Sequence, residues 1–252
     1  MFLARIVVLL KFLKINKFYL ILAVDTYVTI SKSKGKLYSI VLNLPETHYF
    51  REFIKEDRTN ENGIFYIGGI SNHRGLDTTL EALKILKERN IEFFMHYIGP
   101  IPSKELMDRI GLETIENNIK FYGRLDLTDG YALSRKCKVG LAVLKPIENY
   151  KYSYPTKIFE YMSIKLPIVT SNFKLYKDVV EAYNCGYCID PFSSEDLANS
   201  IETIFKDKNL SIKMGENGFN LVNSKFNWEH QEKTLISYYK KVLKRHNSIY
   251  DK

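Results

Sequence analysis

Short apolar runs alternate with segments of helical periodicity from residue 64 almost to the end of the chain. Such runs are typical of buried strands, and the segments between them are typical of helices. Strands are predicted at residues 64–67, 93–98, 119–122, 139–144, 168–170 and 187–189. Strands that alternate with helices form a parallel sheet with helices on both faces, since their crossovers are right-handed. The sequence therefore predicts an α/β fold with a doubly wound, mostly parallel, Rossmann-like sheet.

The helix within residues 155–166 is marked most clearly. Pro155 suits the first turn of a helix, because that turn leaves its N–H positions unpaired in any case. Ile158, Phe159 and Met162 give the segment an apolar face, and Pro167 is expected to end it. Further helices are predicted at residues 76–88, 103–110, 128–136, 175–183, 194–205, 212–223 and 228–244.

The chain outside this regular part divides by charge and periodicity. Residues 2–24 are apolar and basic, and they predict an amphipathic helix. Their lysines interrupt the stretch too often for a transmembrane span, and no signal-peptide cleavage site follows it. Residues 51–63 are highly charged and are the predicted linker. The remaining predicted segments are strands at 27–30 and 39–42, the regular domain at 64–225 and a C-terminal crossover helix at 226–252.

The charge of the chain favours anionic partners. The net charge is +8 and the isoelectric point is about 9.1, which favours phosphate groups or anionic lipid heads. The lysines are spread along the chain and do not form a basic block, so nucleic acid is not an expected partner.

Neither the cysteines nor the acidic residues form a metal or redox motif. Cys137, Cys185 and Cys188 are too few for a disulfide framework. The Cys185–Cys188 pair has no second ligand pair, and Gly186 between them suggests a helix cap. Asp126 and Asp129 have the wrong spacing for an Asp-x-Asp metal loop and suit helix capping. We therefore expect neither a metal nor a cofactor.

Two loops at the carboxyl ends of predicted strands carry residues suited to phosphate binding, and ligands bind at these ends of open parallel sheets. Gly68 and Gly69 follow the first strand and would let a backbone approach a phosphate closely. Arg74 precedes a predicted helix N-terminus, and Gly123 ends another strand. The spacing matches neither the dinucleotide fingerprint nor a Walker motif. Taken alone, such glycines are more often ordinary turn residues than parts of a phosphate site.

The helix after Pro155 adds three polar residues to this edge. Thr156 and Lys157 lie at its mouth, and Glu160 lies among apolar neighbours. A carboxylate in such surroundings needs a partner, because an unpaired buried charge is costly. Glu160 either pairs with a nearby lysine or accepts hydrogen bonds from vicinal hydroxyls such as those of a ribose. Convergence of Arg74, Lys157 and Glu160 would bind a nucleoside diphosphate.

Ordered motifs give the chain a family resemblance. The segments are Tyr-Ile-Gly-Gly-Ile-Ser-Asn-His-Arg-Gly-Leu-Asp (66–77), Ile-Lys-Phe-Tyr-Gly-Arg (119–124), Pro-Thr-Lys-Ile-Phe-Glu-Tyr-Met (155–162), Leu-Pro-Ile-Val-Thr-Ser (166–171), Gly-Tyr-Cys-Ile-Asp-Pro (186–191) and Phe-Asn-Trp-Glu (226–229). Together they resemble the donor half of the retaining, GT-B-fold glycosyltransferases of family 4, over residues 64–243.

The resemblance implies that a nucleotide sugar binds against this domain. Glu160 matches the family glutamate that holds the donor ribose, and Arg74 matches the basic residue that contacts the diphosphate. Gly68 matches the glycine of the phosphate-facing loop, and Lys157 is a further contact. The predicted donor-binding set is Gly68, Gly69, Arg74, Gly123, Thr156, Lys157 and Glu160, and no residue is assigned a catalytic role.

Three departures from the family pattern bear on function. The family often has Gly-Arg where this chain has Gly68-Gly69, so one diphosphate cation is missing or replaced. An earlier family glutamate, commonly beside the donor sugar, corresponds to Tyr152, and Glu148 lies too far upstream to align. Residues 1–50 resemble only the end of an N-terminal acceptor domain, so we expect most of that domain to be missing from this chain.

The resemblance implies metal-independent, cofactor-free transfer of a sugar from a nucleotide donor to a polysaccharide or glycolipid acceptor. Cell-envelope synthesis is the expected context, in the cytoplasm or at the inner face of the membrane. Two alternatives are an inactive nucleotide-sugar-binding fragment and one half of a split enzyme with a partner chain. A third, an NAD-type dehydrogenase, would need an acidic residue about twenty positions after the glycines, and Glu88 is a poor candidate.

Overall fold

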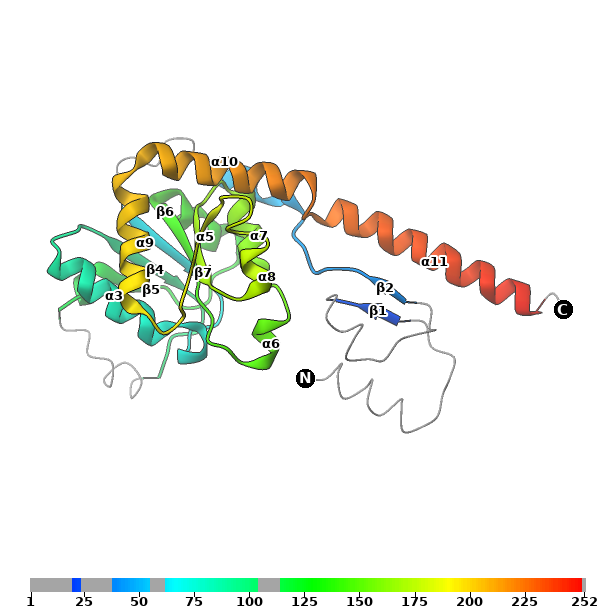
Figure 1. The fold of residues 1–252 in the computed structure, drawn as a ribbon, viewed down its shortest axis with the longest axis horizontal. Helices are drawn as coiled ribbons and strands as arrows, with labels where there is room; N and C mark the ends of the chain where they lie inside the picture. The colour runs from blue at the N-terminus through cyan, green and yellow to red at the C-terminus, as the bar shows by residue number, and fades with distance from the viewer. Residues whose placement is uncertain (1–19, 24–37, 55–61, 104–113, 251–252) are drawn as a thin grey trace. The chain divides into compact units, whose positions relative to one another are not determined.

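The computed structural model describes the chain apart from residues 1–19, 24–37, 55–61, 104–113 and 251–252 (Figure 1). Its internal contacts divide the chain into two units. One consists of residues 45–227, and the other joins residues 1–44 to residues 228–252.

The larger unit is built on a parallel sheet, as the sequence predicts. Its six strands lie in the order β5-β4-β3-β6-β7-β8, and every neighbouring pair is parallel. The chain moves outward from β3 in one direction, returns to β6 beside β3, and then moves outward in the other direction. The strands are β3 (Gly63–Ile67), β4 (Phe94–Ile98), β5 (Ile119–Phe121), β6 (Cys137–Ala142), β7 (Ile168–Ser171) and β8 (Gly186–Ile189). The strand order reverses between β3 and β6, which is where such sheets bind ligands.

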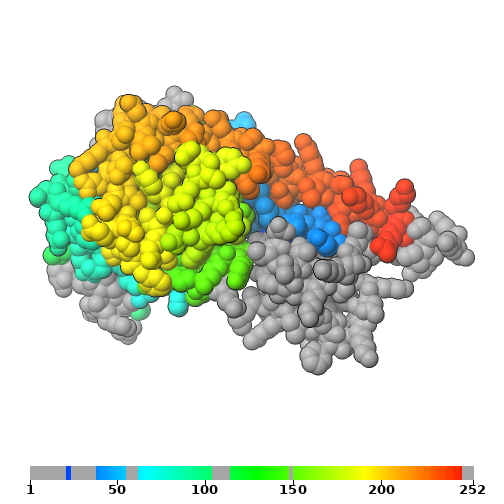
Figure 2. All heavy atoms as spheres, viewed as in Figure 1, coloured from blue at the N-terminus to red at the C-terminus, as the bar shows by residue number. Residues whose placement is uncertain are grey.

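Helices cover both faces of this sheet because side chains alternate along each strand. Ile64 and Tyr66 belong to the core that includes α3 and α9. Phe65, between them, points the other way and contacts Tyr131 and Tyr161. The helix α3 packs on α9, while α7 packs on α10; α10 follows α9 directly, and both lie on the face drawn in Figure 2. The helices are α3 (Leu76–Glu88), α5 (Leu127–Ala132), α6 (Glu148–Lys151), α7 (Thr156–Ser163), α8 (Lys174–Lys177), α9 (Ser194–Lys206) and α10 (Lys208–Ser224).

Four 3₁₀ segments complete the larger unit. They are η1 (Thr47–Phe53), η2 (Asn72–Arg74), η3 (Glu116–Asn118) and η4 (Leu133–Lys136). The segment η4 continues α5, so the predicted helix at residues 128–136 is an α-helix followed by a 3₁₀ turn.

Several local predictions in the larger unit were wrong. Pro155 is the N-cap of α7 and not a residue of its first turn, and α7 ends at Ser163, before Pro167. The backbone reverses there through Lys165, at a φ of 56°. The predicted helix at 175–183 is only the single turn α8 followed by turns, and α6 was not predicted.

The suggestion that Gly186 caps a helix was also wrong. Gly186 begins β8 at a φ of 158°, where a Cβ atom would lie 1.9 Å from the carbonyl oxygen of Ile168. The close approach of β8 to β7 therefore requires glycine at this position.

The smaller unit contains two short strands and a long helix. The strands β1 (Leu20–Leu22) and β2 (Tyr38–Ile40) are parallel, and the backbone N–H of Leu42 donates a 2.8 Å hydrogen bond to Gln231 in α11 (Trp228–Tyr250). The amphipathic helix predicted for residues 2–24 was wrong at Leu20–Leu22, which are extended. The rest of that helix, the strand at 27–30 and most of the helix at 103–110 lie outside the described residues.

The structure describes only part of the predicted linker at residues 51–63. Residues 51–53 of the predicted linker belong to η1, where Phe53 is buried, and residues 55–61 are not described. The linker and the other domain boundaries stay predictions.

None of the helices in the described part of the chain has the length and apolar character needed to span a bilayer.

Candidate functional site

Three glycines follow one another along the carboxyl edge of the sheet. Gly68, Gly99 and Gly123 come after β3, β4 and β5, and all have positive φ values, of 129°, 150° and 74°. The N–H of Gly68 donates to the carbonyl of Ile98, and the N–H of Gly99 donates to the carbonyl of Gly123, at 2.9 and 2.8 Å. A Cβ atom on Gly99 would lie 1.9 Å from the oxygen of Gly68. Small residues therefore let the three loops approach one another at this edge.

Arg74 lies over the first of these loops. It ends η2, and Gly75 then turns the chain into α3 at a φ of 72°. A Cβ atom on Gly69 would lie 3.5 Å from the central carbon of the Arg74 guanidinium. Burial lowers the pKa of Arg74, but the nearby hydroxyls of Tyr66 and Tyr150 raise it by more, so the net pKa is higher than usual. Arg74 is thus held at the end of β3, where the sequence analysis placed it.

Lys157 brings a second cation to the same point. Its side chain is only 6% exposed, and among the described residues its Nζ has no hydrogen-bond partner. Nζ lies 3.7 Å from the centre of the Tyr66 ring. A Cβ atom on Gly68 would be 3.2 Å from Nζ and 3.8 Å from a terminal nitrogen of Arg74. The two cations therefore converge over Gly68.

This environment makes Lys157 easy to deprotonate. Burial and the charge of Arg74 together lower its pKa to about 7, and Glu160 partly opposes both. A buried ammonium without a hydrogen-bond acceptor is costly, and an anionic ligand would remove that cost.

Glu160 is half-buried on the same helix, three residues after Lys157. The hydroxyl of Tyr131 donates a 2.5 Å hydrogen bond to its Oε2. Burial raises the pKa of Tyr131 well above its usual value, so the hydroxyl stays a donor. No lysine or arginine of the described chain forms an ion pair with Glu160. The partner is therefore a tyrosine, which the sequence analysis missed because nothing in the pattern links positions 131 and 160.

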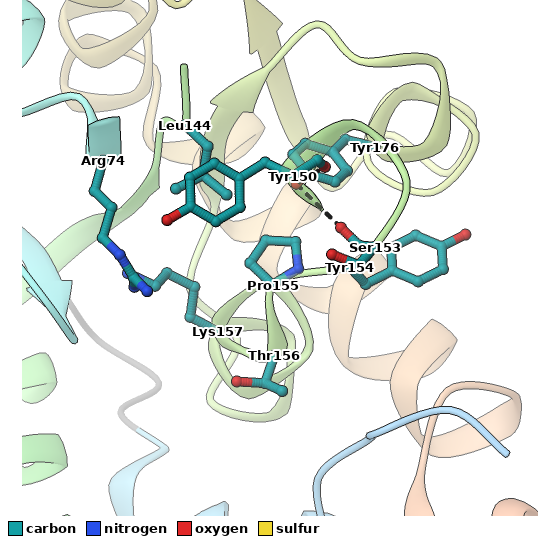
Figure 3. A pocket seen from close by; sticks show the side chains of 9 residues that line it. All are labelled: Arg74, Leu144, Tyr150, Ser153, Tyr154, Pro155, Thr156, Lys157 and Tyr176. Atoms are coloured by element: carbon teal, nitrogen blue, oxygen red, sulfur yellow. Dashed lines mark hydrogen bonds between the residues drawn. The ribbon is translucent and has the colours of Figure 1, made fainter. Parts of the chain in front are cut away.

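A pocket of about 230 Å³ opens beside the two cations (Figure 3). Arg74 and Lys157 lie together on one side of it, and the Tyr150 ring points toward Arg74. Its lining residues are Arg74, Leu144, Tyr150, Ser153, Tyr154, Pro155, Thr156, Lys157 and Tyr176. Of the predicted donor-binding residues, Arg74, Thr156 and Lys157 line the pocket, whereas Gly68, Gly69, Gly123 and Glu160 lie outside its lining.

Two tyrosines of the pocket were not predicted. The hydroxyl of the buried Tyr176 donates to the carbonyl oxygens of Tyr150 and Ser153, at 2.6 and 3.2 Å. These bonds fix the α6 segment, and with it the Tyr150 ring beside Arg74. The spacing of Tyr150 and Tyr176 along the sequence matches no motif, so only the fold could reveal their place in the site.

The described residues offer no metal centre. They contain no group of three or more histidine, cysteine or acidic side chains that could hold an ion. Asp126 is the N-cap of α5 and accepts a 2.8 Å hydrogen bond from the N–H of Asp129, which confirms the capping interpretation for Asp126; Asp129 itself lies in the first turn of the helix. Burial raises the pKa of Cys185 and Cys188 to about 12, so these thiols stay protonated at neutral pH.

The fold and the site together define an α/β domain of the GT-B type, with paired cations at the carboxyl edge of a parallel sheet. The chain belongs to the family described as "Glycosyl transferases group 1", whose model matches residues 50–221.

Two curated relatives are similar over most of this chain. One is "Capsular polysaccharide biosynthesis glycosyltransferase CapM" of Staphylococcus aureus, 20% identical over 73% of this chain and 48% of its own length. The other is "Alpha-D-kanosaminyltransferase" of Streptomyces kanamyceticus, 20% identical over 71% of this chain and 45% of its own length. The chain thus spans about half the length of the curated relatives it matches.

Solved structures share the fold. Sucrose-phosphate synthase from Thermosynechococcus elongatus has a TM-score of 0.78 at 17% identity, over 95% of this chain and 62% of that one. Anabaena Alr3699/HepE in complex with UDP and glucose has a TM-score of 0.71 at 18% identity, over 87% of this chain and 62% of that one. At these identities the likeness establishes the fold alone.

Proposed function

We propose that this domain binds a nucleoside-diphosphate sugar and serves its transfer, by a retaining and metal-independent mechanism, to a glycan or glycolipid acceptor. One observation carries the proposal. The buried ammonium of Lys157 has no hydrogen-bond acceptor among the described residues and lies beside Arg74 over Gly68. Two converging cations, one of which lacks a hydrogen-bond acceptor, need an anion that carries at least two negative charges. A diphosphate is such an anion.

The diphosphate would lie between the Gly68 loop and the mouth of α7. Gly68 and Gly69 leave the backbone open to a phosphate, and Arg74 and Lys157 supply the charge. Thr156 begins α7 at the pocket wall, where its hydroxyl and the helix N-terminus add donors. Gly123 belongs to the same edge, beyond Gly99, and would face the nucleoside.

Glu160 would accept hydrogen bonds from the ribose hydroxyls. Tyr131 occupies Oε2, so the carboxylate is fixed while Oε1 stays available to a ligand. The family match and the UDP-containing neighbour structure support a nucleotide sugar as the ligand. They support it more than they support a dinucleotide.

The fold also argues against the dehydrogenase alternative. The helix α3 begins at the carboxyl edge and Glu88 is its last residue. Twelve residues of rise place Glu88 about 18 Å from that edge, too far for a contact with a ribose bound there.

In the proposed reaction the bond between the anomeric carbon and the diphosphate breaks, and negative charge develops on the leaving diphosphate. The transition state has oxocarbenium character, as in other glycosyl chemistry. Arg74 and Lys157 are already in place to stabilise the developing charge, which lowers the barrier without reorganisation. The polysaccharide or glycolipid acceptor and a cell-envelope role follow from the family resemblance and the capsular relative. The cytoplasmic location, the association with a membrane face and a partner chain that supplies an acceptor domain rest on the resemblance alone.

Calorimetric titration of the chain with UDP, ADP, GDP and the matching monophosphates tests the proposal. We expect one diphosphate to bind, and to bind at least tenfold more tightly than its monophosphate. Donor hydrolysis is assayed in parallel. Binding with turnover supports a transferase, binding without turnover supports a binding module or half of a split enzyme, and no binding of any diphosphate contradicts the proposal.

A further inference from the structure

Tyr66 lies against both cations of the proposed diphosphate site and against the glycine loop. It is the penultimate residue of β3 and only 3% exposed. Its ring lies 3.7 Å from Nζ of Lys157. Its hydroxyl donates to the carbonyl oxygen of Gly69 and lies close enough to the guanidinium of Arg74 to raise the pKa of that group, which burial lowers. Both cations and the glycine loop are therefore fixed to a single side chain.

The two ends of Tyr66 act differently on the two cations. The ring face attracts a desolvated ammonium and so favours the charged form of Lys157. No hydrogen-bond acceptor among the described residues provides this stabilisation. The hydroxyl donates its one proton to Gly69, so its oxygen keeps lone pairs that attract the guanidinium of Arg74. Burial raises the pKa of Tyr66 to about 12, although Arg74 opposes this, so the hydroxyl remains a donor at neutral pH.

We infer that Tyr66 is a positioning residue for the leaving diphosphate: its ring holds Lys157 and its hydroxyl orients Arg74 before the ligand arrives. The inference rests on the proposed function. If Arg74 and Lys157 are ordered before the ligand binds, binding does not carry the entropy cost of immobilising two flexible side chains. Tyr66 need not touch the ligand, because it acts through Lys157 and Arg74.

Among the described residues, two charged groups act on Lys157. Arg74 of η2 and Glu160 of α7 act on it directly, and Tyr150 of α6 contacts Arg74 from the pocket side. Of these, only Arg74 is a cation. A change in the titration of Lys157 when Tyr66 is replaced, with Arg74 and Glu160 retained, therefore reports on the ring.

Two substitutions separate the ring from the hydroxyl. Tyr66→Phe keeps the ring and removes the bond to Gly69 and the electrostatic attraction of the hydroxyl for Arg74. Tyr66→Leu removes both. Tyr97→Phe is the matched control, since Tyr97 is equally buried on β4, with its ring 5.4 Å from that of Tyr66, and does not contact the cations. The probes are UDP and any tighter-binding diphosphate from the panel above.

The first measurement needs no ligand. Side-chain NMR of lysines follows the titration of Lys157, assigned by its disappearance in Lys157→Met. We expect the midpoint to stay near its wild-type value in Tyr66→Phe and Tyr97→Phe. In Tyr66→Leu it should fall by about one pH unit, because the charged form loses its cation–π contact. An unchanged midpoint in a folded Tyr66→Leu protein would overturn the role of the ring.

The second measurement is affinity for the diphosphate. Tyr66→Phe should bind about fivefold more weakly than wild type, and Tyr66→Leu more than tenfold more weakly, with smaller losses for the monophosphate. If Tyr66→Leu does not fold, Tyr66→Phe carries this test alone. Wild-type affinity in Tyr66→Phe overturns the role of the hydroxyl. Failure of the wild-type protein to bind any diphosphate contradicts the proposed function instead, and the ligand-free titration still decides whether the ring holds Lys157.

Discussion

The hydroxyl of Tyr131 lies 2.5 Å from Oε2 of Glu160 and joins α5 to α7 across the end of the sheet. The Tyr131 ring is buried and packs against Phe50 and Phe53 of η1 and Phe65 of β3. The carboxylate is therefore oriented by a residue whose own position is fixed by the core. Such support keeps a binding side chain in one rotamer before the ligand binds.

Removing this hydroxyl tests that support. Tyr131→Phe should weaken nucleoside-diphosphate binding about fivefold to tenfold, because the carboxylate loses a charge-assisted hydrogen bond and its fixed orientation. Titration calorimetry with UDP measures the loss. Tyr122→Phe is the control, since its hydroxyl pairs with His96 at 2.9 Å and lies away from Glu160. Equal losses in both variants would mean that Tyr131 acts only through stability.

The ribose role of Glu160 can be tested by changing the ligand together with the protein. Wild type should bind UDP more tightly than 2′-deoxy- or 3′-deoxy-UDP, because a carboxylate held near vicinal hydroxyls gains about 1.5–3 kcal/mol per charged hydrogen bond. In Glu160→Ala that discrimination should disappear while the protein keeps its fold. A variant that still prefers the ribonucleotide by the same factor would show that another group contacts the ribose.

Much of this arrangement follows from the sequence, and the reason is local. The strand pattern, the helix α3 and the positions of Arg74, Lys157 and Glu160 depend on periodicity and on residues close in the chain. Tyr66, Tyr131, Tyr150 and Tyr176 could not be found in this way. Each acts through a contact with another segment, such as the 29-residue separation between Tyr131 and Glu160, and a tyrosine that supports a site has the same sequence pattern as one that fills a core.

The helix ends were missed for a related reason. The end of α7 at Ser163 depends on the positive φ of Lys165 and on the N–H of Leu166, which donates to the carbonyl of Tyr161. Neither residue is a typical helix terminator, whereas Pro167 is. The sequence therefore placed the end of the helix at the proline, beyond the residues where the chain turns.

The depressed pKa of Lys157 should make nucleotide binding depend on pH. The free protein loses the Lys157 proton near pH 7, whereas a bound diphosphate favours the charged ammonium and raises its pKa. Affinity for UDP should therefore fall above pH 7, by up to about tenfold per pH unit, with proton uptake on binding. Calorimetry at pH 8 in two buffers of different ionisation enthalpy measures that uptake. Lys157→Met should bind weakly and show no uptake, and proton uptake by this variant would assign the effect to another group.

The same group should affect stability in the opposite sense. Because the folded-state pKa of Lys157 is lower than its unfolded value of about 10.5, the unfolded chain binds more protons between pH 7 and pH 10.5. The free energy of unfolding should therefore gain a contribution that rises through this range, by about 1.4 kcal/mol per pH unit at most. Lys157→Met should lack this contribution in urea titrations of the ligand-free protein. At pH 6 it should be more stable than wild type, because it buries no ammonium.

Gly69 offers a test of the missing cation. A side chain there would begin 3.5 Å from the Arg74 guanidinium, which is ordinary contact. Gly68 differs, since its φ of 129° strains any side chain and its Cβ would approach Nζ of Lys157 to 3.2 Å. Gly69→Arg should therefore fold, but its added positive charge should lower the stability of the ligand-free protein by repelling the two existing cations.

In the UDP complex of Gly69→Arg, all three positive charges interact with the diphosphate. The affinity for UDP should therefore rise about threefold to tenfold at low salt and depend more steeply on salt. Gly69→Gln controls for side-chain volume without charge. If Gly69→Arg binds no more tightly than Gly69→Gln at low salt, the diphosphate does not lie over this loop.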